Sequence, residues 1–257
     1  MDIDAVRELY DLHERRGANY PRFRKVETGT TVRMIALDDD EPCTLIYSRL
    51  GEDDADAAIA AEIEYFRKTG RPFEWKLYSH DTPADLKERL TARGFSIGED
   101  EAIMALDLSR LPPGWEKTPD VHVRKAIDEA GRRDFSLASR AAWSGHPEAW
   151  LDSILKTLRE SPARMSAWVA YADGQPACAA RIDFPEGSPF ASLWGGATLE
   201  PFRKRGLYTA LVAARAREAI ERGYRYLTID ASPMSRPIAE RHGFRLLSIS
   251  NPCDSPS

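Results

Sequence analysis

Residues 201–216, PFRKRGLYTALVAARA, place three cations directly before a glycine and then turn apolar. Arg203, Lys204 and Arg205 repel one another, so this arrangement is favoured where something negative sits beside it. A helix that starts at Gly206 would add unpaired backbone amides and the positive end of its dipole, and glycine lets a ligand approach the backbone closely. The stretch therefore predicts a phosphate-binding helix start, with a solvated basic turn as the alternative.

The elements around this stretch favour phosphate binding over a plain surface turn. Residues 190–199 are typical of a strand, and residues 225–229 and 235–242 of a strand and a helix. The helix behind the loop carries an apolar stripe and ends before Gly223. The stripe consists of Tyr208, Leu211, Val212, Ala216, Ala219 and Ile220.

Composition narrows the class of protein. The chain has 257 residues and a formal net charge of −5, which argues against broad binding to nucleic acid or to an anionic membrane. No apolar run approaches the roughly 20 residues of a membrane-spanning helix, and the charged N-terminus, MDIDAVRELYDLHERR, is unlike a signal peptide. The three cysteines lie far apart, so we expect no disulfide, no metal site and a reduced, cytoplasmic setting.

Residues 108–120 form the most turn-rich stretch near the middle of the chain. They contain Pro112-Pro113-Gly114 and Pro119, which cannot continue a helix or a central strand. We therefore expect two domains, residues 1–112 and 113–257. The first should hold helices over residues 3–16, 55–68 and 84–93, and strands over residues 22–37, 42–50, 74–79 and 102–108, with a turn at DDDEP, residues 38–42. After the linker we expect a strand over residues 121–125, helices over 129–143 and 147–160, and two strands flanking a hairpin turn at Asp173-Gly174.

The two halves align with each other without a gap over twenty residues. KLYSHDTPADLKERLTARGF, residues 76–95, lies over RYLTIDASPMSRPIAERHGF, residues 225–244, at an offset of 149 (243 − 94) that pairs Gly94 with Gly243. This predicts an internal repeat. At the same offset, residues 203–206 (RKRG) align with residues 54–57 (DADA). These aligned positions, called the slot below, are cationic in the second half and acidic in the first.

LEPFRKRGLYTAL, residues 199–211, resembles motif A of the GNAT (Gcn5-related) N-acetyltransferases, Arg/Gln-x-x-Gly-x-Gly/Ala. IDASPMSRPIAERHGF, residues 229–244, is similar to motif B of the same family. The resemblance implies an α/β (α+β) fold with two GNAT-like mixed sheets flanked by helices. Its first domain, without a CoA site, would be a degenerate copy in a tandem arrangement.

The resemblance also implies an activity, the direct transfer of an acetyl group from acetyl-CoA to an unidentified amine acceptor in the second domain. The strand before the loop would splay from its neighbour and pair with the pantetheine arm, and the Leu199 amide would stabilise the oxyanion. Because the acidic slot would repel pyrophosphate, we expect one CoA site per chain, in a monomer or homodimer. The expected CoA-binding residues are Ala197, Thr198, Leu199, Arg203, Lys204, Arg205, Gly206, Leu207, Tyr208, Thr209, Ser232 and Ser235.

The sequence departs from the family's pattern in two places. Tyr208 stands where motif A usually has Gly or Ala, and Ala239 stands where motif B often has the tyrosine that protonates the leaving thiolate. Since alanine donates no proton, a non-catalytic acyl-CoA-binding or interaction module is the alternative function. Glu200 is the candidate general base beside the expected reaction centre. The other candidates, each with a structural explanation as well, are Asp230, His146 and His242, and Trp143 and Trp150 could wall an acceptor pocket.

Overall fold

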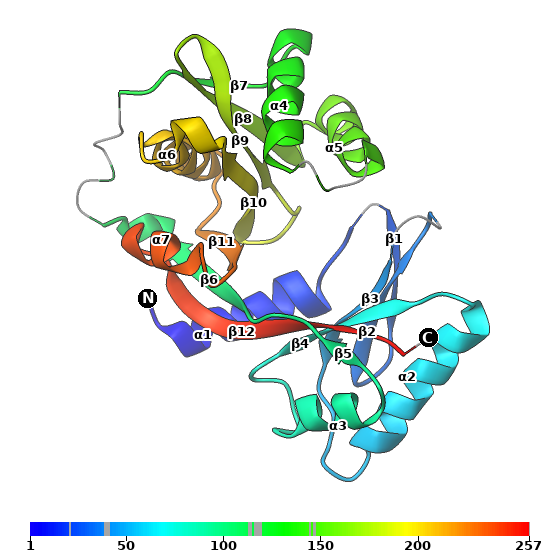
Figure 1. The fold of residues 1–257 in the computed structure, drawn as a ribbon. Helices are drawn as coiled ribbons and strands as arrows, with labels where there is room; N and C mark the ends of the chain where they lie inside the picture. The colour runs from blue at the N-terminus through cyan, green and yellow to red at the C-terminus, as the bar shows by residue number, and fades with distance from the viewer. Residues whose placement is uncertain are drawn as a thin grey trace. The chain divides into compact units, whose positions relative to one another are not determined.

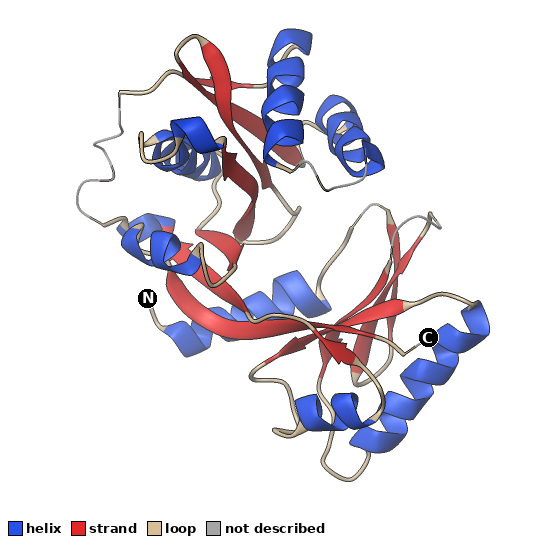
Figure 2. Ribbon diagram, in the orientation of Figure 1, coloured by secondary structure: helices blue, strands red, loops and turns tan. Residues whose placement is uncertain are grey.

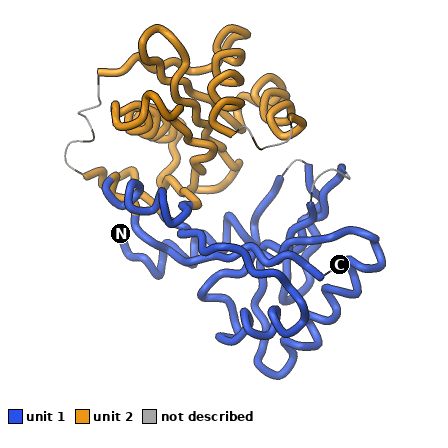
Figure 3. The backbone as a smooth tube through the Cα atoms, viewed as in Figure 1, with its two compact units in different colours: residues 1–104, 231–241, 245–257 blue, residues 105–230, 242–244 orange. Residues whose placement is uncertain are grey.

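The computed structural model describes residues 1–20, 22–38, 42–112, 115, 120–143, 145 and 148–256. The chain divides into two compact units (Figure 3): unit 1 is Met1–Met104, Ala231–Arg241 and Arg245–Ser257, and unit 2 is Ala105–Asp230 and His242–Phe244. These units, which are defined by packing, differ from the expected domains 1–112 and 113–257. The expected domains describe the two copies of the internal repeat, and they stay a prediction. Residues 113, 114 and 116–119 of the expected linker and residues 39–41 of the expected turn lie outside the described residues.

Unit 1 is a mixed sheet flanked by helices (Figures 1 and 2). Its strand order is β1-β2-β3-β4-β12-β6, and β5 pairs with β12. Strands β3 and β4 are parallel, whereas β12 runs antiparallel to β4. The strands are β1 (Phe23–Glu27), β2 (Thr31–Ala36), β3 (Cys43–Ser48), β4 (Phe73–Tyr78), β5 (Ser96–Ile97), β6 (Glu101–Asp107) and β12 (Arg245–Asp254). The helices are α1 (Ile3–Tyr10), the π-helix η1 (Asp11–Arg16), α2 (Ala55–Thr69), α3 (Leu86–Ala92) and α7 (Arg236–Arg241).

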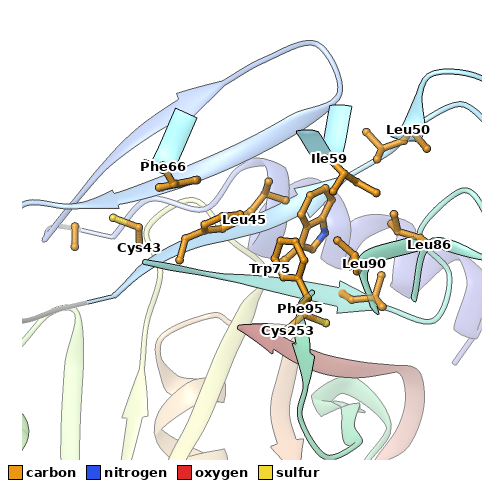
Figure 4. Packing of buried hydrophobic residues seen from close by; sticks show 14 residues of the cluster. Cys43, Leu45, Leu50, Ile59, Phe66, Trp75, Leu86, Leu90, Phe95 and Cys253 are labelled. Atoms are coloured by element: carbon orange, nitrogen blue, oxygen red, sulfur yellow. The ribbon is translucent and has the colours of Figure 1, made fainter. Parts of the chain in front are cut away.

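The core of unit 1 explains why the C-terminal strand belongs to it. Trp75 of β4 is fully buried, and Phe66 of α2 stacks on Phe73 with ring centroids 4.1 Å apart (Figure 4). Cys253 of β12 is fully buried in the same cluster. The sequence did not predict β12, because Pro252 and its polar neighbours Ser248, Ser250 and Asn251 hide the alternation that marks a strand.

The strands of unit 2 are also mixed in direction and have helices on both faces. Their order is β6-β11-β10-β9-β8-β7, so β6 contributes residues to both units. The strands are β7 (Val123–Lys125), β8 (Met165–Ala172), β9 (Gln175–Asp183), β10 (Phe190–Thr198) and β11 (Tyr226–Ala231). The helices are α4 (Glu129–Ala142), α5 (Glu148–Glu160), α6 (Leu207–Glu221) and the short 3-10 helices η2 (Leu108–Arg110) and η3 (Glu200–Phe202).

Side-chain alternation on β8 and β9 assigns the helices to the two faces of this sheet. Val169 and Ala179 pack in the cluster with α4 and α5, whereas Ala170, Cys178 and Ala180 pack in the cluster with α6. Each small residue lets a helix approach the sheet closely.

The mixed α/β fold is therefore confirmed, and most expected elements form. The predicted hairpin turn is present, with Asp173 at φ 52° and Gly174 at φ 77°. The one strand expected over residues 22–37 is instead the hairpin β1–β2, because the chain turns at Thr28, whose hydroxyl accepts from the amide of Thr31 at 3.0 Å.

Glu218 connects α6 to the edge strand β7 and its neighbour β8 by hydrogen bonds. Its carboxylate accepts hydrogen bonds from Lys125 Nζ at 2.6 Å, Ser166 Oγ at 2.7 Å, Trp168 Nε1 at 2.8 Å and Arg222 Nη2 at 2.7 Å. Burial raises the pKa of Glu218, but these hydrogen bonds outweigh it, so the pKa lies below its usual value. The carboxylate thus stabilises the fold above the unfolded-state pKa, and this contribution is lost as the pH falls through the folded-state pKa.

We expect Glu218→Gln to lower the free energy of unfolding by about 2 kcal/mol at pH 7, because charge-assisted hydrogen bonds are lost. Urea denaturation followed by tryptophan fluorescence measures it, and the loss should shrink in acid, where the wild-type carboxylate is also protonated. Glu221→Gln, at an exposed position of the same helix, is the matched control. Equal effects of the two substitutions would contradict the anchoring role.

Candidate functional site

The parallel pair β10–β11 opens partway along its length. The pairing runs from Phe190↔Tyr226 to Leu193↔Ile229, although β10 continues to Thr198 and β11 to Ala231. On the other side of β10, the register with β9 shifts between Trp194 and Ala197, which marks a β-bulge. The predicted splay is therefore present in the described part of the chain, and it leaves one backbone edge of residues 194–198 open.

The direction of the backbone groups corrects one prediction. The Leu199 amide donates to the carbonyl of Ala177 at 2.9 Å, so it is not free to stabilise an oxyanion. Successive backbone groups along a strand alternate in direction, which turns Ala197 towards β9 and the N–H and C=O of Thr198 towards the open edge. Consistent with this, the Thr198 carbonyl accepts from Arg203 Nε at 3.4 Å. Thr198 replaces Leu199 as the candidate oxyanion donor.

The start of α6 has the geometry expected of an anion site. Gly206 is the N-cap residue at φ 80° and ψ 0°, and no side chain caps the helix. The first helical bond runs from Ala210 N to Gly206 O at 2.9 Å, so the amides of Leu207, Tyr208 and Thr209 precede the helical pattern. Among L-residues the left-handed φ of Gly206 is unfavourable, which explains the glycine.

The three cations of the loop have different surroundings. Arg205 forms a bidentate pair with Asp173 at the tip of the β8–β9 hairpin, with both N···O distances 2.8 Å. The hydrogen bond from Arg205 lowers the pKa of Asp173. Arg203 is exposed, and Lys204 is exposed without an ion pair among the described residues, at a left-handed φ of 62°. The chain thus neutralises one of its three crowded charges and leaves two for another anion.

The remaining predicted residues are scattered. Glu200 is exposed on η3. Ser232 and Ser235 belong to unit 1, where their hydroxyls lie 3.2 Å apart, and their contact with CoA stays a prediction. His242 lies 3.4 Å from the Thr209 hydroxyl through its Nε2. Residue 146 is outside the described residues.

The seven-residue spacing of Trp143 and Trp150 favours one face of a single helix, and this interpretation is wrong. Trp143 is the C-cap residue of α4 and Trp150 lies in α5, with their ring centroids 6.5 Å apart. The alignment of the two halves also predicts a shared capping role for Asp81 and Asp230. Asp81 accepts from the Tyr78 amide at 3.0 Å and Asp230 lies within β11, and the shared role stays a prediction.

Helix α2 of unit 1 corresponds to α6, and its start corrects the register of the repeat. Both ends of the two helices differ by 152 residues (207 − 55 and 221 − 69), whereas Gly94 and Gly243, at φ 87° and 86°, keep the offset of 149. Gly206 therefore corresponds to Asp54, and the loop to residues 51–54 (GEDD). The slot remains acidic after the correction.

In unit 1 the strand opening that corresponds to the β10–β11 splay is filled by an ion pair. The β3–β4 pairing ends at Leu45↔Trp75. Just beyond it, Arg15 of η1 donates through Nε to the Ile46 carbonyl at 3.1 Å and through Nη2 to both Asp81 oxygens at 2.7 and 2.9 Å. The Arg15 side chain is fully buried. Its guanidinium therefore takes the backbone acceptor that a ligand in this opening would use.

A cavity of about 360 Å³ in unit 1 is lined by residues that include Asp81, Lys87, Asp100 and Asn251. Its polar groups already bind one another, since Lys87 Nζ lies 3.1 Å from Asn251 Oδ1 and Asn251 Nδ2 lies 2.8 Å from Asp100 Oδ1. Within the described ranges, no group of three or more His, Cys, Asp or Glu residues could hold a metal ion, and no helix is long and apolar enough to cross a membrane.

Part of the chain matches the model of a known protein family. Residues 135–244 match the model of the Acetyltransferase (GNAT) family. The match includes β10, the cationic loop and α6. No curated protein sequence matches the chain.

Solved structures share the fold over nearly the whole chain. A GCN5-related N-acetyltransferase from Kribbella flavida is 17% identical, with a TM-score of 0.69 over 98% of this chain and 94% of that one. A tandem GNAT protein from the clavulanic acid biosynthesis pathway is 16% identical, with a TM-score of 0.65 over 100% and 89%. A functionally unknown conserved protein from Staphylococcus epidermidis is 14% identical, with a TM-score of 0.69 over 92% and 95%. At such identities the likeness concerns the fold alone.

Proposed function

We propose that unit 2 transfers an acetyl group from acetyl-CoA to an amine acceptor. The observation that carries this proposal is the conjunction of an opened β10–β11 pair with an uncapped, cationic helix start at the end of the same strand. The amides of residues 207–209 and the side chains of Arg203 and Lys204 suit a pyrophosphate in charge. Arg205 stays a candidate contact, which would exchange Asp173 for the phosphate. The open edge at Thr198 suits the amide-rich pantetheine arm.

In this proposal acetyl-CoA supplies a thioester carbonyl that is open to attack by a neutral amine. The Thr198 amide would donate to the oxygen of that carbonyl as negative charge develops on it. Glu200 stays the candidate base for an ammonium acceptor, and Ser232 and Ser235 stay candidate CoA contacts. The first domain would be a catalytically silent copy, since Arg15 and Asp81 fill its opening and the loop at residues 51–54 is acidic.

One observation favours a second function, a non-catalytic acyl-CoA-binding module. Ala239 stands where the family often has its acid, and it is 3% exposed. No proton can come from this position to a leaving thiolate.

Two measurements on the same protein separate these functions. Calorimetry gives the acetyl-CoA affinity and stoichiometry, and a thiol assay follows CoA release with a panel of small amines, aminoglycosides and lysine peptides. Binding at one site with amine-dependent release would support the transferase. Binding without release for any acceptor would favour the module, and the absence of binding would contradict both functions.

A further inference from the structure

Arg215 is a buried cation without a counterion. It is 1% exposed, and it donates through Nε to the Leu211 carbonyl at 3.1 Å and through Nη1 to the Arg181 carbonyl at 3.0 Å. Its Nη2 has no hydrogen-bond partner among the described residues. Burying an unpaired charge costs several kcal/mol of folding free energy, so we expect this side chain to have a functional role.

The orphaned Nη2 points at the opened strand. A Cβ atom on Gly196 of β10 would lie 3.7 Å from Arg215 Nη2 and 2.7 Å from Cε2 of Tyr208. Gly196 is the exposed residue of this strand, and it directly precedes the segment whose edge faces the expected thioester. The Tyr208 ring and the guanidinium of Arg215 therefore both lie beside Gly196, next to the segment expected to face the thioester.

The charges around Tyr208 are few. The pKa of Tyr208 lies above its usual value, because burial raises it more than the guanidinium of Arg215 lowers it, and Cys178 raises it as well. The thiol of Cys178 is itself kept neutral because burial raises its pKa. The His242 ring is the other titratable neighbour, with its centroid 6.4 Å from that of Tyr208. Arg215 is thus the positive charge placed to stabilise a tyrosinate here.

We propose that Tyr208 is the catalytic residue that protonates the CoA sulfur, and that Arg215 is the positioning residue that stabilises the resulting tyrosinate. The inference rests on the proposed function. It accounts for both departures from the family's pattern. This chain has a phenol at Tyr208, where Gly or Ala is usual, and it lacks the usual phenol at Ala239.

The neutral amine nitrogen attacks the thioester carbonyl and a C–N bond forms. The C–S bond then breaks while the Tyr208 O–H proton passes to sulfur, which gives CoA as the thiol. The proton lost by the amine nitrogen passes through water to the tyrosinate, which restores the phenol.

The first test is Tyr208→Phe, assayed with two acyl donors. With acetyl-CoA we expect kcat to fall about 100-fold, as for loss of a general acid, with the acetyl-CoA Kd unchanged. With S-(4-nitrophenyl) thioacetate, whose thiolate leaves without a proton, wild type and variant should react at similar rates. Tyr224→Phe, which removes a hydroxyl bound to the Pro185 carbonyl at 2.9 Å elsewhere in unit 2, is the matched control.

The second test uses the pH dependence of kcat and does not need the Tyr208 variant to fold. Wild-type kcat should fall on the alkaline side as Tyr208 loses its proton, and Arg215→Met should move this fall to higher pH because the cation that lowers the pKa of Tyr208 is gone. A Tyr208→Phe variant as active as Tyr224→Phe, or an alkaline limb that Arg215→Met leaves in place, would overturn the inference alone. Wild-type protein without any amine-dependent CoA release would overturn the proposed function and this inference together.

Discussion

Replacing Arg203 and Arg205 together by alanine is expected to weaken acetyl-CoA binding by about 100-fold or more. A charge-assisted hydrogen bond contributes about 1.5–3 kcal/mol, and each 1.4 kcal/mol is tenfold in affinity. The fold should change in stability by less than about 1 kcal/mol, because the Arg205–Asp173 pair lies at the surface. Calorimetry measures the affinity and urea denaturation the stability.

Arg217→Ala is the matched control for this double variant. Arg217 is exposed on the same helix, ten residues after its first residue Leu207, so its removal lowers the net charge without touching the loop. Equal acetyl-CoA affinities of the double variant and the wild type would contradict the assignment of this loop as the pyrophosphate site.

Asp173→Asn should act in the opposite direction. In the structure the carboxylate of Asp173 already fills both hydrogen-bonding positions on the outer face of Arg205. A phosphate must displace it, so removing the charge of Asp173 is expected to tighten acetyl-CoA binding a few-fold, most clearly at low salt. Weaker binding would instead mean that Asp173 holds Arg205 in its productive position.

The loop and its helix could be predicted because their signals are local. Three adjacent cations, the glycine at a left-handed φ and the apolar stripe all lie within twenty residues, and each depends on neighbours in sequence. Gly223, expected to end α6, has a φ of 82° for the same reason. The splay followed from the family resemblance and not from the residues of β10.

What the sequence could not show depends on register and on distant partners. The bulge at residues 194–197 decides whether the Leu199 amide faces β9 or the open edge. No pattern of residues in this segment predicts the bulge. The partner of Arg205 is 32 residues away at a hairpin tip, and Arg15 meets Asp81 across 66 residues. The strand β12 was missed because Pro252 and its polar neighbours hide the alternation of a strand, and because its partner β4 is distant in the sequence.

Arg15→Met is expected to lower the free energy of unfolding by about 3–5 kcal/mol, the usual cost of breaking one side of a buried ion pair. The Asp81 side chain is 2% exposed, so the substitution leaves a buried carboxylate without its cation. The destabilisation should shrink as the pH falls. Burial raises the folded-state pKa of Asp81, and a group of this kind is most stabilising when protonated, with the contribution lost as the pH rises.

The double variant Arg15→Met/Asp81→Asn separates the charge effect from simple loss of packing. Once the Asp81 carboxylate is neutral, no fully buried charge in this cluster lacks a partner, because Asp11, the other acidic partner of Arg15, is partly exposed and keeps its contact with His80 Nε2 at 2.9 Å. Most of the lost stability should therefore return in urea denaturation. A double variant as unstable as Arg15→Met would show that the guanidinium acts through its contacts with Ile46 and the ring of Tyr78, 3.7 Å from the centroid, and not through charge. Calorimetry on the same double variant should still give one acetyl-CoA site per chain, because opening the β3–β4 gap leaves residues 51–54 acidic and without a glycine at the helix start. A second site would mean that Arg15 alone silences the first copy.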